Sequence, residues 1–400
     1  MWANMSSRCR VRSKPGQRAH DHPTTTRQEF DMILSVVGDT VISRPLRPRP
    51  EGLARPGDSA LGLLDGADLT IGNLEVALTA RGVPAEKPVA MRAPQSGAAE
   101  LARLGFDALS LATNHALDWG IDGMRDTIAA LDDAGIRHAG AGEDVAQAAS
   151  ASYVSAASGE QVALLSFCSA LPPNFNATNE RPGIAPIRVR QTFEYDGVIL
   201  EEQPGTPPFV HSWAHEPDVI RAVEAIRAAK AREVPVVVAL HWGVPWCYLP
   251  STQGPLAQYQ RPLAHRLVEA GADLIIGHHS HCLHPVEAYR NSLILYSTGN
   301  FVFHHQVDIT GDGGRPTPPV NPVLVDGPWY DSAIFDVTLG GPVPRLRVRP
   351  IVLDENNEPT IPTEERSAAI LGELERSSRA LSRSARFTAA GEFVSDEPGS

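Results

Sequence analysis

The amino-acid sequence predicts a layered α/β fold, and three observations support this. Short apolar runs rich in Val, Ile and Leu alternate with segments of helical periodicity along most of the chain. Polar residues of the kinds used in catalysis follow several of these runs directly. The chain has 400 residues, of which 42% are hydrophobic, so it can bury a substantial core and is not intrinsically disordered.

Strands are expected where apolar, β-branched runs occur, such as MILSVVG at 32–38 and VPVVVAL at 234–240. The full set of predicted strands is 32–38, 68–73, 106–111, 162–168, 234–240, 273–276, 284–289, 292–296, 332–338 and 345–352. A turn at Arg290-Asn291 separates the two strands of one hairpin.

Helices are expected between these strands. In 121–134, apolar residues recur at helical spacing, and the pattern stops at Gly135, a residue that commonly ends helices. The predicted helices are 96–104, 121–134, 216–232, 255–270 and a charged segment near 363–383. Strands that alternate with helices in this way favour parallel β-sheet.

The chain is divided into three parts by composition. Residues 1–31 are polar and lack the apolar region of a secretory signal, so we expect a disordered N-terminal arm. Residues 32–355 are expected to form one catalytic domain, in which 169–215, rich in Pro, Asn and aromatic residues, is a long insertion. Residues 356–400 are expected to be a C-terminal helix and a flexible tail.

Charge, cysteines and hydropathy narrow the class of protein. The 35 basic residues (Lys and Arg) against 47 acidic residues give a net charge of −12, which argues against a nucleic-acid surface. None of the four cysteines belongs to a CxxC pair, so neither a disulfide framework nor a zinc ribbon is indicated. The same cysteine pattern leads us to expect a reducing, cytoplasmic location. No apolar run approaches the roughly 18 to 20 residues that span a bilayer, so we expect no membrane anchor.

Polar side chains gather at the ends of the predicted strands. In α/β sheets the carboxyl edge of the strands is where ligands bind, so side chains from several strand ends are expected to meet there. The residues in question are Asp39, Asn73 to Glu75, Asn114-His115, His241 and His278 to His281.

These residues could hold a metal ion. In an extended segment, His279 and His281 would point the same way, with Ser280 opposed and His278 facing away from the pair. Imidazole, carboxylate and amide ligands together suit Mn, Fe or Zn, or Ca or Mg where oxygens dominate. Each residue also has an ordinary interpretation: the histidines as a polar turn or hydrogen-bonding groups, and Asp39 as a helix cap.

Six motifs resemble the CapA family, named for capsule and poly-γ-glutamate synthesis. They are GDTVISR (38–44), GNLEVALT (72–79), ATNHALDWGIDGMRDT (112–127), HWG (241–243), GADLIIGHHSH (271–281) and LYSTGNFVF (295–303). The resemblance spans roughly residues 32–305. It implies the calcineurin-like metallophosphoesterase fold, a four-layer αββα sandwich. It also implies a divalent metal (Ca, Mn, Zn, Fe or Mg) surrounded by Asp39, Glu75, Asn114, His241, His279 and His281.

The same resemblance implies an acid/base residue, His115, which Asp118 could orient. Arg44 matches the arginine of the first motif and could hold an anionic substrate group. For chemistry that requires a second acid/base group, His281 and Asp39 are the candidates.

The chain departs from the family pattern in three places, one of which is Glu75, at the second acidic position, where the family pattern has Asp. Phosphoesterases carry D-x-H in the first motif, whereas Val41 stands where that histidine would be. The loss of one imidazole favours a single metal over a close pair. Capsule-type members often read HWG-x-E-Y, whereas this chain has Pro245 and Trp246 at the last two positions.

Aromatic residues suggest what the site accepts. Trp119, Trp242 and Trp246 lie in or beside the site motifs, and although each could be a core residue, together they favour a pocket with aromatic walls. We therefore expect a peptide or small anionic substrate. The first hypothesis is Cα epimerisation of a C-terminal, aromatic residue in a ribosomal peptide, as in the family's lasso-peptide branch. The alternatives are a phosphoester hydrolase or capsule synthesis protein, and a metal-binding accessory protein without catalysis.

Overall fold

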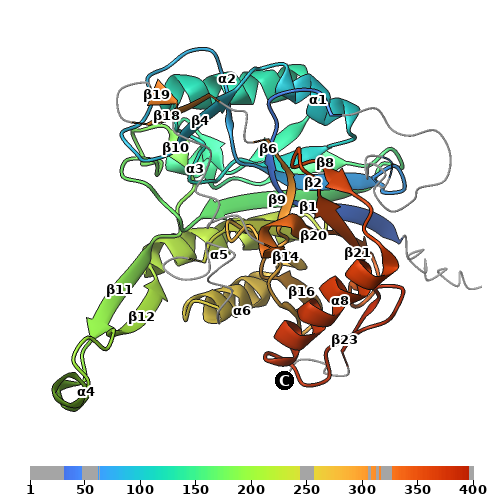
Figure 1. Ribbon diagram of the computed structural model, residues 1–400. Helices are drawn as coiled ribbons and strands as arrows, with labels where there is room; N and C mark the ends of the chain where they lie inside the picture. The colour runs from blue at the N-terminus through green and yellow to red at the C-terminus, as the bar shows by residue number, and fades with distance from the viewer. Residues whose placement is uncertain are drawn as a thin grey trace, which may run out of the picture.

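The computed structural model describes residues 31–46, 62, 64–243, 256–304, 308–311, 315–316 and 327–395 of the chain. Two β-sheets lie face to face, and helices cover the outer face of each (Figure 1). This is the predicted four-layer α/β/β/α sandwich. The N-terminal arm expected at 1–31 lies, apart from Asp31, outside the described residues.

Within the described residues, the first sheet has eight strands in the order β22-β21-β20-β1-β2-β5-β6, with β17 also beside β1. The strands around β1 run parallel, and the strands from β20 to β22 complete the sheet in antiparallel fashion. The bounds are β1 (Met32–Val41), β2 (Leu69–Leu74), β5 (Ala108–Ser110), β6 (Arg137–Ala139), β17 (Asn300–Phe303), β20 (Asp331–Leu339), β21 (Arg345–Leu353) and β22 (Pro359–Thr360).

The second sheet has six described strands in the order β15-β16-β14-β13-β9-β8. Its central strands are parallel, and an antiparallel strand closes each edge. The bounds are β8 (Ser152–Ser155), β9 (Gln161–Cys168), β13 (Val236–His241), β14 (Leu274–His278), β15 (Val286–Tyr289) and β16 (Ser292–Leu295). The carboxyl ends of the parallel strands of each sheet therefore lie at one edge.

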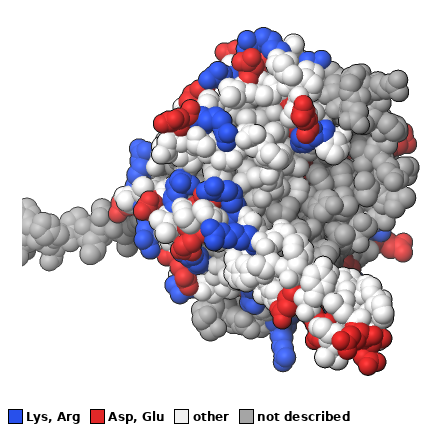
Figure 2. Space-filling view, turned by 90° about the vertical axis from the view of Figure 1, so that its left-hand side faces the viewer, with Lys and Arg blue, Asp and Glu red and all other residues white. Residues whose placement is uncertain are grey.

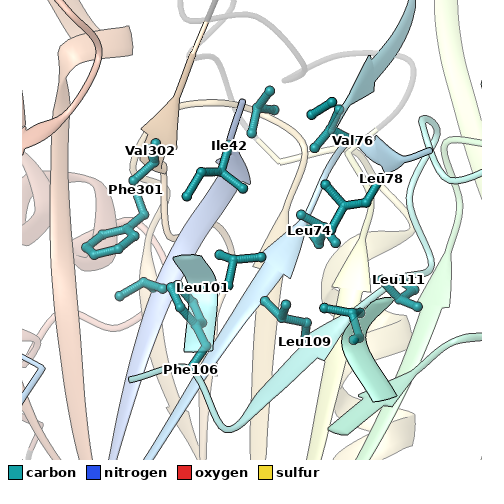
Figure 3. Packing of buried hydrophobic residues seen from close by; sticks show 14 of the residues in the cluster. Ile42, Leu74, Val76, Leu78, Leu101, Phe106, Leu109, Leu111, Phe301 and Val302 are labelled. Atoms are coloured by element: carbon teal, nitrogen blue, oxygen red, sulfur yellow. The ribbon is translucent and has the colours of Figure 1, made fainter. Parts of the chain in front are cut away.

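Three apolar cores hold the layers together. Between the sheets, Leu34 and Ile71 of the first pack in one cluster with Val237 and Ile276 of the second. Parallel strands are buried on both faces, which explains their nearly continuous apolar sequence. Outer cores join the first sheet to α1 (Gly97–Arg103) and α2 (Gly120–Asp133), as Figure 3 shows around Leu101, and the second sheet to α5 (Glu216–Lys230) and α6 (Gln260–Ala270).

The predicted helices are found where helical spacing indicated them, with ends that differ by a few residues. The predicted turn at Arg290-Asn291 joins β15 and β16, and Arg290 adopts a positive φ of 52° there. None of the described helices is both long and apolar enough to cross a lipid bilayer. The remaining short elements are β3 (Ala77–Leu78), β4 (Ala90–Ala93), β7 (Ala141–Gly142), β10 (Gly183–Ile184), β18 (Asp308–Gly311), β19 (Arg315–Pro316), α3 (Val145–Ala148) and α7 (Gly327–Tyr330).

The predicted insertion at 169–215 contains a projecting arm. Strands β11 (Val189–Glu194) and β12 (Phe209–Ala214) form an antiparallel ribbon, and the helix α4 (Gly197–Glu202) lies at its far end (Figure 1). The sequence did not indicate this ribbon, because its strands mix polar and apolar residues without a clean alternation.

The C-terminal region is more ordered than expected in its described part. The helix α8 (Glu364–Arg379) agrees with the predicted helix and contacts β21 and β15. Beyond it, β23 (Arg386–Phe387) and β24 (Phe393–Val394) form a small hairpin, and Val348 of β21 donates a hydrogen bond to the Gly391 carbonyl at 2.8 Å. The prediction of a flexible tail was therefore wrong for these residues, because Phe387 and Phe393 pack against each other and the inner core.

Candidate metal centre

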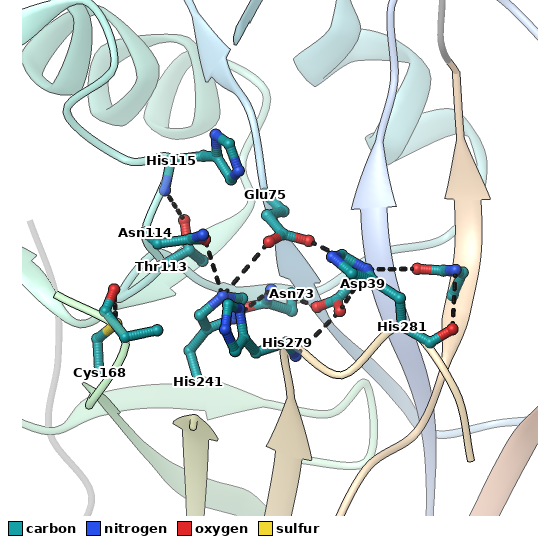
Figure 4. A network of polar contacts seen from close by, with 12 residues as sticks. Asp39, Asn73, Glu75, Thr113, Asn114, His115, Cys168, His241, His279 and His281 are labelled. Carbon is teal, nitrogen blue, oxygen red and sulfur yellow. Dashed lines mark hydrogen bonds and ion pairs between the residues drawn. The ribbon is translucent and has the colours of Figure 1, made fainter. Parts of the chain in front are cut away.

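The strand ends bring the predicted polar residues together (Figure 4). Asp39 lies near the end of β1, Glu75 follows β2, and His241 is the last residue of β13. His279 and His281 follow β14. Asp39, Glu75 and His241 are fully buried, so polar groups from the two facing sheets meet in the protein interior.

Gly38 allows β1 to pass close to the segment before β17. A Cβ atom at Gly38 would lie 2.1 Å from the carbonyl oxygen of Gly299, so no larger residue fits there. The next N–H, that of Asp39, donates a hydrogen bond to the Gly299 oxygen at 2.9 Å. The register of β1 shifts at this point, which turns the Asp39 carboxylate into the site.

Two groups of donor atoms could each hold a metal ion. Asp39, Glu75 and His281 form one group, and Glu75, His241 and His279 form the other. In each group the donor atoms lie within 4.8 Å of one another, and all of these side chains lie in the interior. The two groups share Glu75, whose Oε1 lies 3.3 Å from Nε2 of His241 and whose Oε2 lies 3.8 Å from Nδ1 of His281.

His241 is held by two asparagines as well as by Glu75. Its Nε2 lies 2.9 Å from Oδ1 of Asn114, and its Nδ1 lies 3.4 Å from Nδ2 of Asn73. Asn73 also donates a hydrogen bond to Asp39 at 2.8 Å. The structure thus places Asn114 beside the histidine with which it was expected to act, and Asn73 links the two donor groups.

His279 and His281 reach the site by a different route from the one expected. Both have positive φ angles, 94° and 55°, so the segment is not extended, and the expectation that they point the same way as alternate residues of a strand was wrong. The His279 N–H donates to Asp39 at 3.0 Å, and Nδ1 of His281 lies 2.9 Å from Oδ1 of Asn300. Strained backbone of this kind persists where surrounding contacts hold it in place, and is concentrated at functional sites. His278 belongs to neither donor group.

Glu75 provides the test of whether these residues suit a cation. Its carboxylate is fully buried, and neither oxygen accepts a hydrogen bond from the described part of the chain. A buried carboxylate without donors is costly unless a positive charge neutralises it. The imidazole and carboxylate groups around it are the ligands that divalent transition metals and zinc prefer. The residues present therefore fit a bound divalent cation.

The electrostatics of the site agree with this conclusion. Burial raises the pKa of the Asp39 carboxyl well above its usual value, and the Glu75 carboxylate raises it further. Burial likewise raises the pKa of Glu75, although His281 opposes the rise. Burial and the neighbouring positive groups lower the pKa of His241 and His279 well below the usual value, which keeps both imidazoles neutral and able to donate a lone pair.

His115 and Asp118 form a pair beside the donor groups. Nδ1 of His115 lies 2.6 Å from Oδ2 of Asp118, as expected from their spacing. Asp118 is fully buried and also accepts a hydrogen bond from the Met91 N–H at 2.6 Å. Because a carboxylate accepts and does not donate, the proton of neutral His115 lies on Nδ1, and Nε2 is left for a substrate.

Lys87 is the residue that the sequence analysis missed. Its Nζ lies 2.6 Å from Oδ1 of Asp118, 2.6 Å from the Asn114 carbonyl oxygen and 3.3 Å from Nδ1 of His115. Only three lysines occur in the chain, and this one stands between two site motifs, which is a weak signal that could have drawn attention to it. Asn73 was expected at this edge of the sheet but not among the metal ligands, and Asn300 lies within a quoted motif but was not assigned to the site.

Comparison with known proteins identifies the family. A family model described as "Bacterial capsule synthesis protein PGA_cap" matches residues 33–305, more than half of the chain. The chain belongs to the PGA_cap family. The resemblance to the CapA family is therefore confirmed, and the matched segment contains both donor groups and the His115–Asp118 pair.

Several known proteins are similar to this PGA_cap chain over about two thirds of its length. An uncharacterized protein of Sinorhizobium fredii is 30% identical over 325 residues, which cover 70% of this chain and 68% of that protein. A probable polyglutamine synthesis accessory protein of Mycobacterium tuberculosis is 33% identical over 275 residues, covering 67% and 63%. The capsule biosynthesis protein CapA of Bacillus anthracis is 29% identical over 292 residues, covering 70% and 62%. The chain thus spans roughly two thirds of the length of these relatives.

Within this PGA_cap site, Val41 contributes packing and no ligand. It is fully buried in the core that also contains Leu74 and Phe301. The donor groups are nevertheless two, because Glu75 belongs to both. The expectation of a single metal rested on the number of imidazoles in the sequence, and the number of ions bound stays a prediction.

The predicted substrate-binding residues have different surroundings. Trp242 is a core residue: it is 1% exposed, stacks on Tyr296, and donates its indole N–H to the Tyr296 carbonyl at 2.9 Å. Its assignment to a pocket wall was wrong, because the strand turns this side chain inward to the helical layer. Trp119 is buried beneath the Arg92 guanidinium, whose carbon lies 3.7 Å from the ring centroid. Contact between Trp119 and substrate stays a prediction.

Arg44 forms an ion pair with Glu358, and about a third of its side chain is exposed. Its predicted contact with an anionic substrate group therefore requires that it leave or share this carboxylate, and it stays a prediction. Trp246 lies outside the described residues.

Proposed function

We propose that this PGA_cap protein is a metal-dependent hydrolase that acts on an anionic substrate during capsule-type or poly-γ-glutamate polymer synthesis. The observation that carries the proposal is the position of Glu75. Its carboxylate belongs to both groups of buried donor atoms, and neither oxygen accepts a hydrogen bond from the described residues. The names of two relatives, the capsule biosynthesis protein of Bacillus anthracis and the probable polyglutamine synthesis accessory protein of Mycobacterium tuberculosis, support the biological setting.

The proposed ligands are Asp39, Glu75 and His281 in one group and Glu75, His241 and His279 in the other. Divalent ions bound there would act as Lewis acids and would lower the pKa of a bound water molecule, as in two-metal phosphatases and peptidases. Asn114 lies beside the second group, and Asn73 and Asn300 orient the carboxylate and imidazole ligands through hydrogen bonds.

We assign the proton transfer to His115. Asp118 fixes the ring through Nδ1, so Nε2 can exchange a proton with the attacking or the leaving group. Because Asp118 is fully buried and paired with Lys87, its charge is held in one place beside the imidazole. Nε2, which carries no proton in the neutral ring, would first take the proton of the attacking water and then return it to the leaving oxygen or nitrogen, and a fixed ring orientation serves both steps.

The geometry favours hydrolysis over epimerisation at Cα. Epimerisation by two bases needs an acid/base group on each face of the substrate. Among the described site residues, His115 is the imidazole that belongs to neither donor group and is oriented by a carboxylate, Asp118, that also belongs to neither. His281, the expected second group, is itself one of the proposed ligands. Peptide epimerisation remains the second candidate, supported by the motif resemblance alone.

The test uses the full chain reconstituted with Zn²⁺, Mn²⁺ or Mg²⁺ and two probes, p-nitrophenyl phosphate and a γ-linked glutamate oligomer. We expect metal-dependent release of p-nitrophenol or of glutamate, and a loss of roughly 100-fold or more in kcat for His115→Ala. His138→Ala is the matched control, since His138 pairs with Asp132 away from the donor groups. Equal loss in both variants, or full activity of His115→Ala, contradicts the proposed role.

A second measurement separates the other two hypotheses. Incubation with candidate peptides in D₂O adds one deuteron per turnover without cleavage if the protein is an epimerase. A protein that binds metal tightly, releases no product and exchanges no proton is instead an accessory protein. Metal analysis of Glu75→Gln tests the site independently of any substrate.

A further inference from the structure

The arm formed by β11 and β12 is a two-stranded ribbon without a third strand in the described part of the chain. A ribbon of this kind is marginally stable in water by itself. The arm also carries five of the large apolar side chains that are exposed on the described surface. Their exposed fractions lie between 49% and 72%, and they are Phe193, Tyr195, Val198, Phe209 and Trp213. The arm therefore presents an incomplete sheet with apolar side chains on it, away from the body of the protein (Figure 1).

The hydrogen bonds of the ribbon show which edge is open. The His215 N–H donates a hydrogen bond to the Arg188 carbonyl at 2.7 Å, so Arg188 and His215 are a hydrogen-bonded pair. Hydrogen-bonded pairs alternate with non-hydrogen-bonded pairs along antiparallel strands, so Thr192 and His211 also direct their backbone groups toward each other within the ribbon. The alternate residues of β11, Gln191 and Phe193, direct their N–H and C=O groups outward.

The two edges differ in what covers them. On β12, the outward N–H of Ser212 donates to the side chain of Gln258, 3.1 Å away, just before α6. On β11, the described residues place no such group. An uncovered row of backbone donors and acceptors is a template for another strand.

We propose that β11 pairs antiparallel with β11 of a second copy of this chain, about a two-fold axis at Thr192, to form a four-stranded sheet. In this register Gln191 lies opposite Phe193 of the partner subunit, and both residues direct their backbone groups outward, as antiparallel pairing requires. The two residues of such a pair exchange two backbone hydrogen bonds. The two-fold axis generates a second, identical pair, Phe193 opposite Gln191 of the partner subunit.

Charge selects this register over its neighbours. Arg190 is exposed and has no ion-pair partner among the described residues. Glu194, at the other end of the strand, lies 2.8 Å from Nε2 of His211 on β12 and would gain Arg190 of the partner subunit as a second, fully charged partner. A two-fold axis at Thr192 places Arg190 opposite Glu194 of the partner subunit, and places the reverse pair at the other end. An axis at Gln191 would put Arg190 opposite Thr192 of the partner subunit and would pair Glu194 only with Arg188, which Asp218 already holds. An axis at Phe193 would put Glu194 opposite Thr192 of the partner subunit and would pair Arg190 only with Asp196, beyond the end of β11. Opposite charges directly across two strands stabilise pairing, whereas like charges destabilise it.

The far end of the arm is consistent with this arrangement. The segment at that end, α4 with its N-cap, contains the exposed acidic residues Asp196, Glu201 and Glu202. Figure 2 shows acidic side chains gathered in the lobe at its lower right. In an antiparallel pair each acidic end lies beside the root of the other arm, where Arg188 and Arg190 stand. Two acidic ends are thus kept apart, although each copy carries a net charge of −12.

The first test is the association state of the full chain, measured by sedimentation equilibrium. We expect a dimer for the natural chain and association weaker by about tenfold or more for Arg190→Glu and for Glu194→Arg, since each change puts like charges across the axis twice. The double variant R190E/E194R restores opposite charges and should restore the dimer. A monomeric natural chain, or a dimer that both single variants leave unchanged, overturns the proposal.

The second test locates the axis. Thr192 would face its own counterpart as a non-hydrogen-bonded pair, whose Cα atoms lie about 4.5 Å apart, a distance that a disulfide spans. Under mild oxidation Thr192→Cys should therefore form a covalent dimer, whereas the matched control Gln191→Cys should not. Both variants are made in a Cys9→Ser/Cys247→Ser background, which serves as the blank, because the two cysteines that remain, Cys168 and Cys282, are buried. Crosslinking of Gln191→Cys in place of Thr192→Cys overturns the register, and crosslinking of neither overturns the pairing.

Discussion

The Lys87 ammonium lies 2.6 Å from one carboxylate oxygen of Asp118, and both groups are shielded from water. The other oxygen of that carboxylate holds His115. Lys87 therefore holds Asp118 in place beside His115, lies 3.3 Å from Nδ1 of the His115 ring itself, and donates a hydrogen bond to the Asn114 carbonyl at 2.6 Å. We infer that Lys87 is a positioning residue for the proposed acid/base group.

Replacement of Lys87 tests that role. Lys87→Met should lower kcat about 10- to 100-fold with little change in KM, because the His115 ring loses its fixed partner while substrate contacts remain. Lys87→Arg, which keeps a positive charge beside Asp118, should recover part of the loss. Metal content measured on the same samples should not change, and a fall in metal content would assign Lys87 to the integrity of the donor groups instead.

Glu75→Gln should have opposite effects on the protein with and without metal. Removing a fully buried charge that lacks hydrogen-bond donors should stabilise the metal-free chain by about 1–3 kcal/mol. The same change should abolish most of the stabilisation that added metal gives, because both donor groups lose their shared ligand. Thermal unfolding with and without Zn²⁺ measures both effects. Glu143→Gln, at a half-exposed carboxylate paired with Arg125, is the control and should keep the metal-dependent rise.

The fold and much of the site could be predicted because their signals are local. Parallel strands that are buried on both faces have nearly continuous apolar sequences. Polar residues directly after such strands lie at the carboxyl edge of the sheet. Asp39, Glu75 and His241 were predicted in this way and lie together. The Asp118 contact with His115 follows from a spacing of three residues in one turn-rich segment.

The rest depends on contacts between segments that are distant in sequence. Lys87 reaches Asp118 from a loop 31 residues away, and nothing in the loop sequence indicates its course. His279 and His281 take positive φ angles because Asp39 and Asn300 hold them, which no alternation rule anticipates. Trp242 stacks on Tyr296, which lies 54 positions along the chain, so its inward direction is a tertiary property.

Trp242 provides a test that separates core packing from substrate binding. Trp242→Ala should lower the free energy of unfolding by about 3–5 kcal/mol, since it removes a fully buried ring that stacks on Tyr296. Trp242→Phe should cost less and should leave KM unchanged. Denaturant unfolding and steady-state kinetics on the two variants check this, and a large rise in KM for the stable Phe variant would return Trp242 to the substrate pocket.

Glu287 should govern part of the acid stability of the protein. Burial raises the pKa of this carboxyl, but hydrogen bonds from His265, Arg261 and Tyr296 outweigh burial and hold it below the usual value of 4.5. The folded state therefore binds this proton more weakly than the unfolded state does. The stabilisation is present above the unfolded pKa and is lost as the pH falls through the folded pKa.

The corresponding experiment compares the natural chain with Glu287→Gln by urea unfolding at a series of pH values from about 7 down to about 3. The natural chain should be the more stable of the two near neutral pH, and the difference should shrink as the pH falls below the unfolded value of 4.5. Tyr296→Phe removes one hydrogen bond to the carboxylate and keeps the ring that stacks on Trp242, so it should reduce the acid-dependent slope only in part. A difference between the natural chain and Glu287→Gln that stays constant with pH would mean that the carboxylate stabilises the fold by packing and not by its charge.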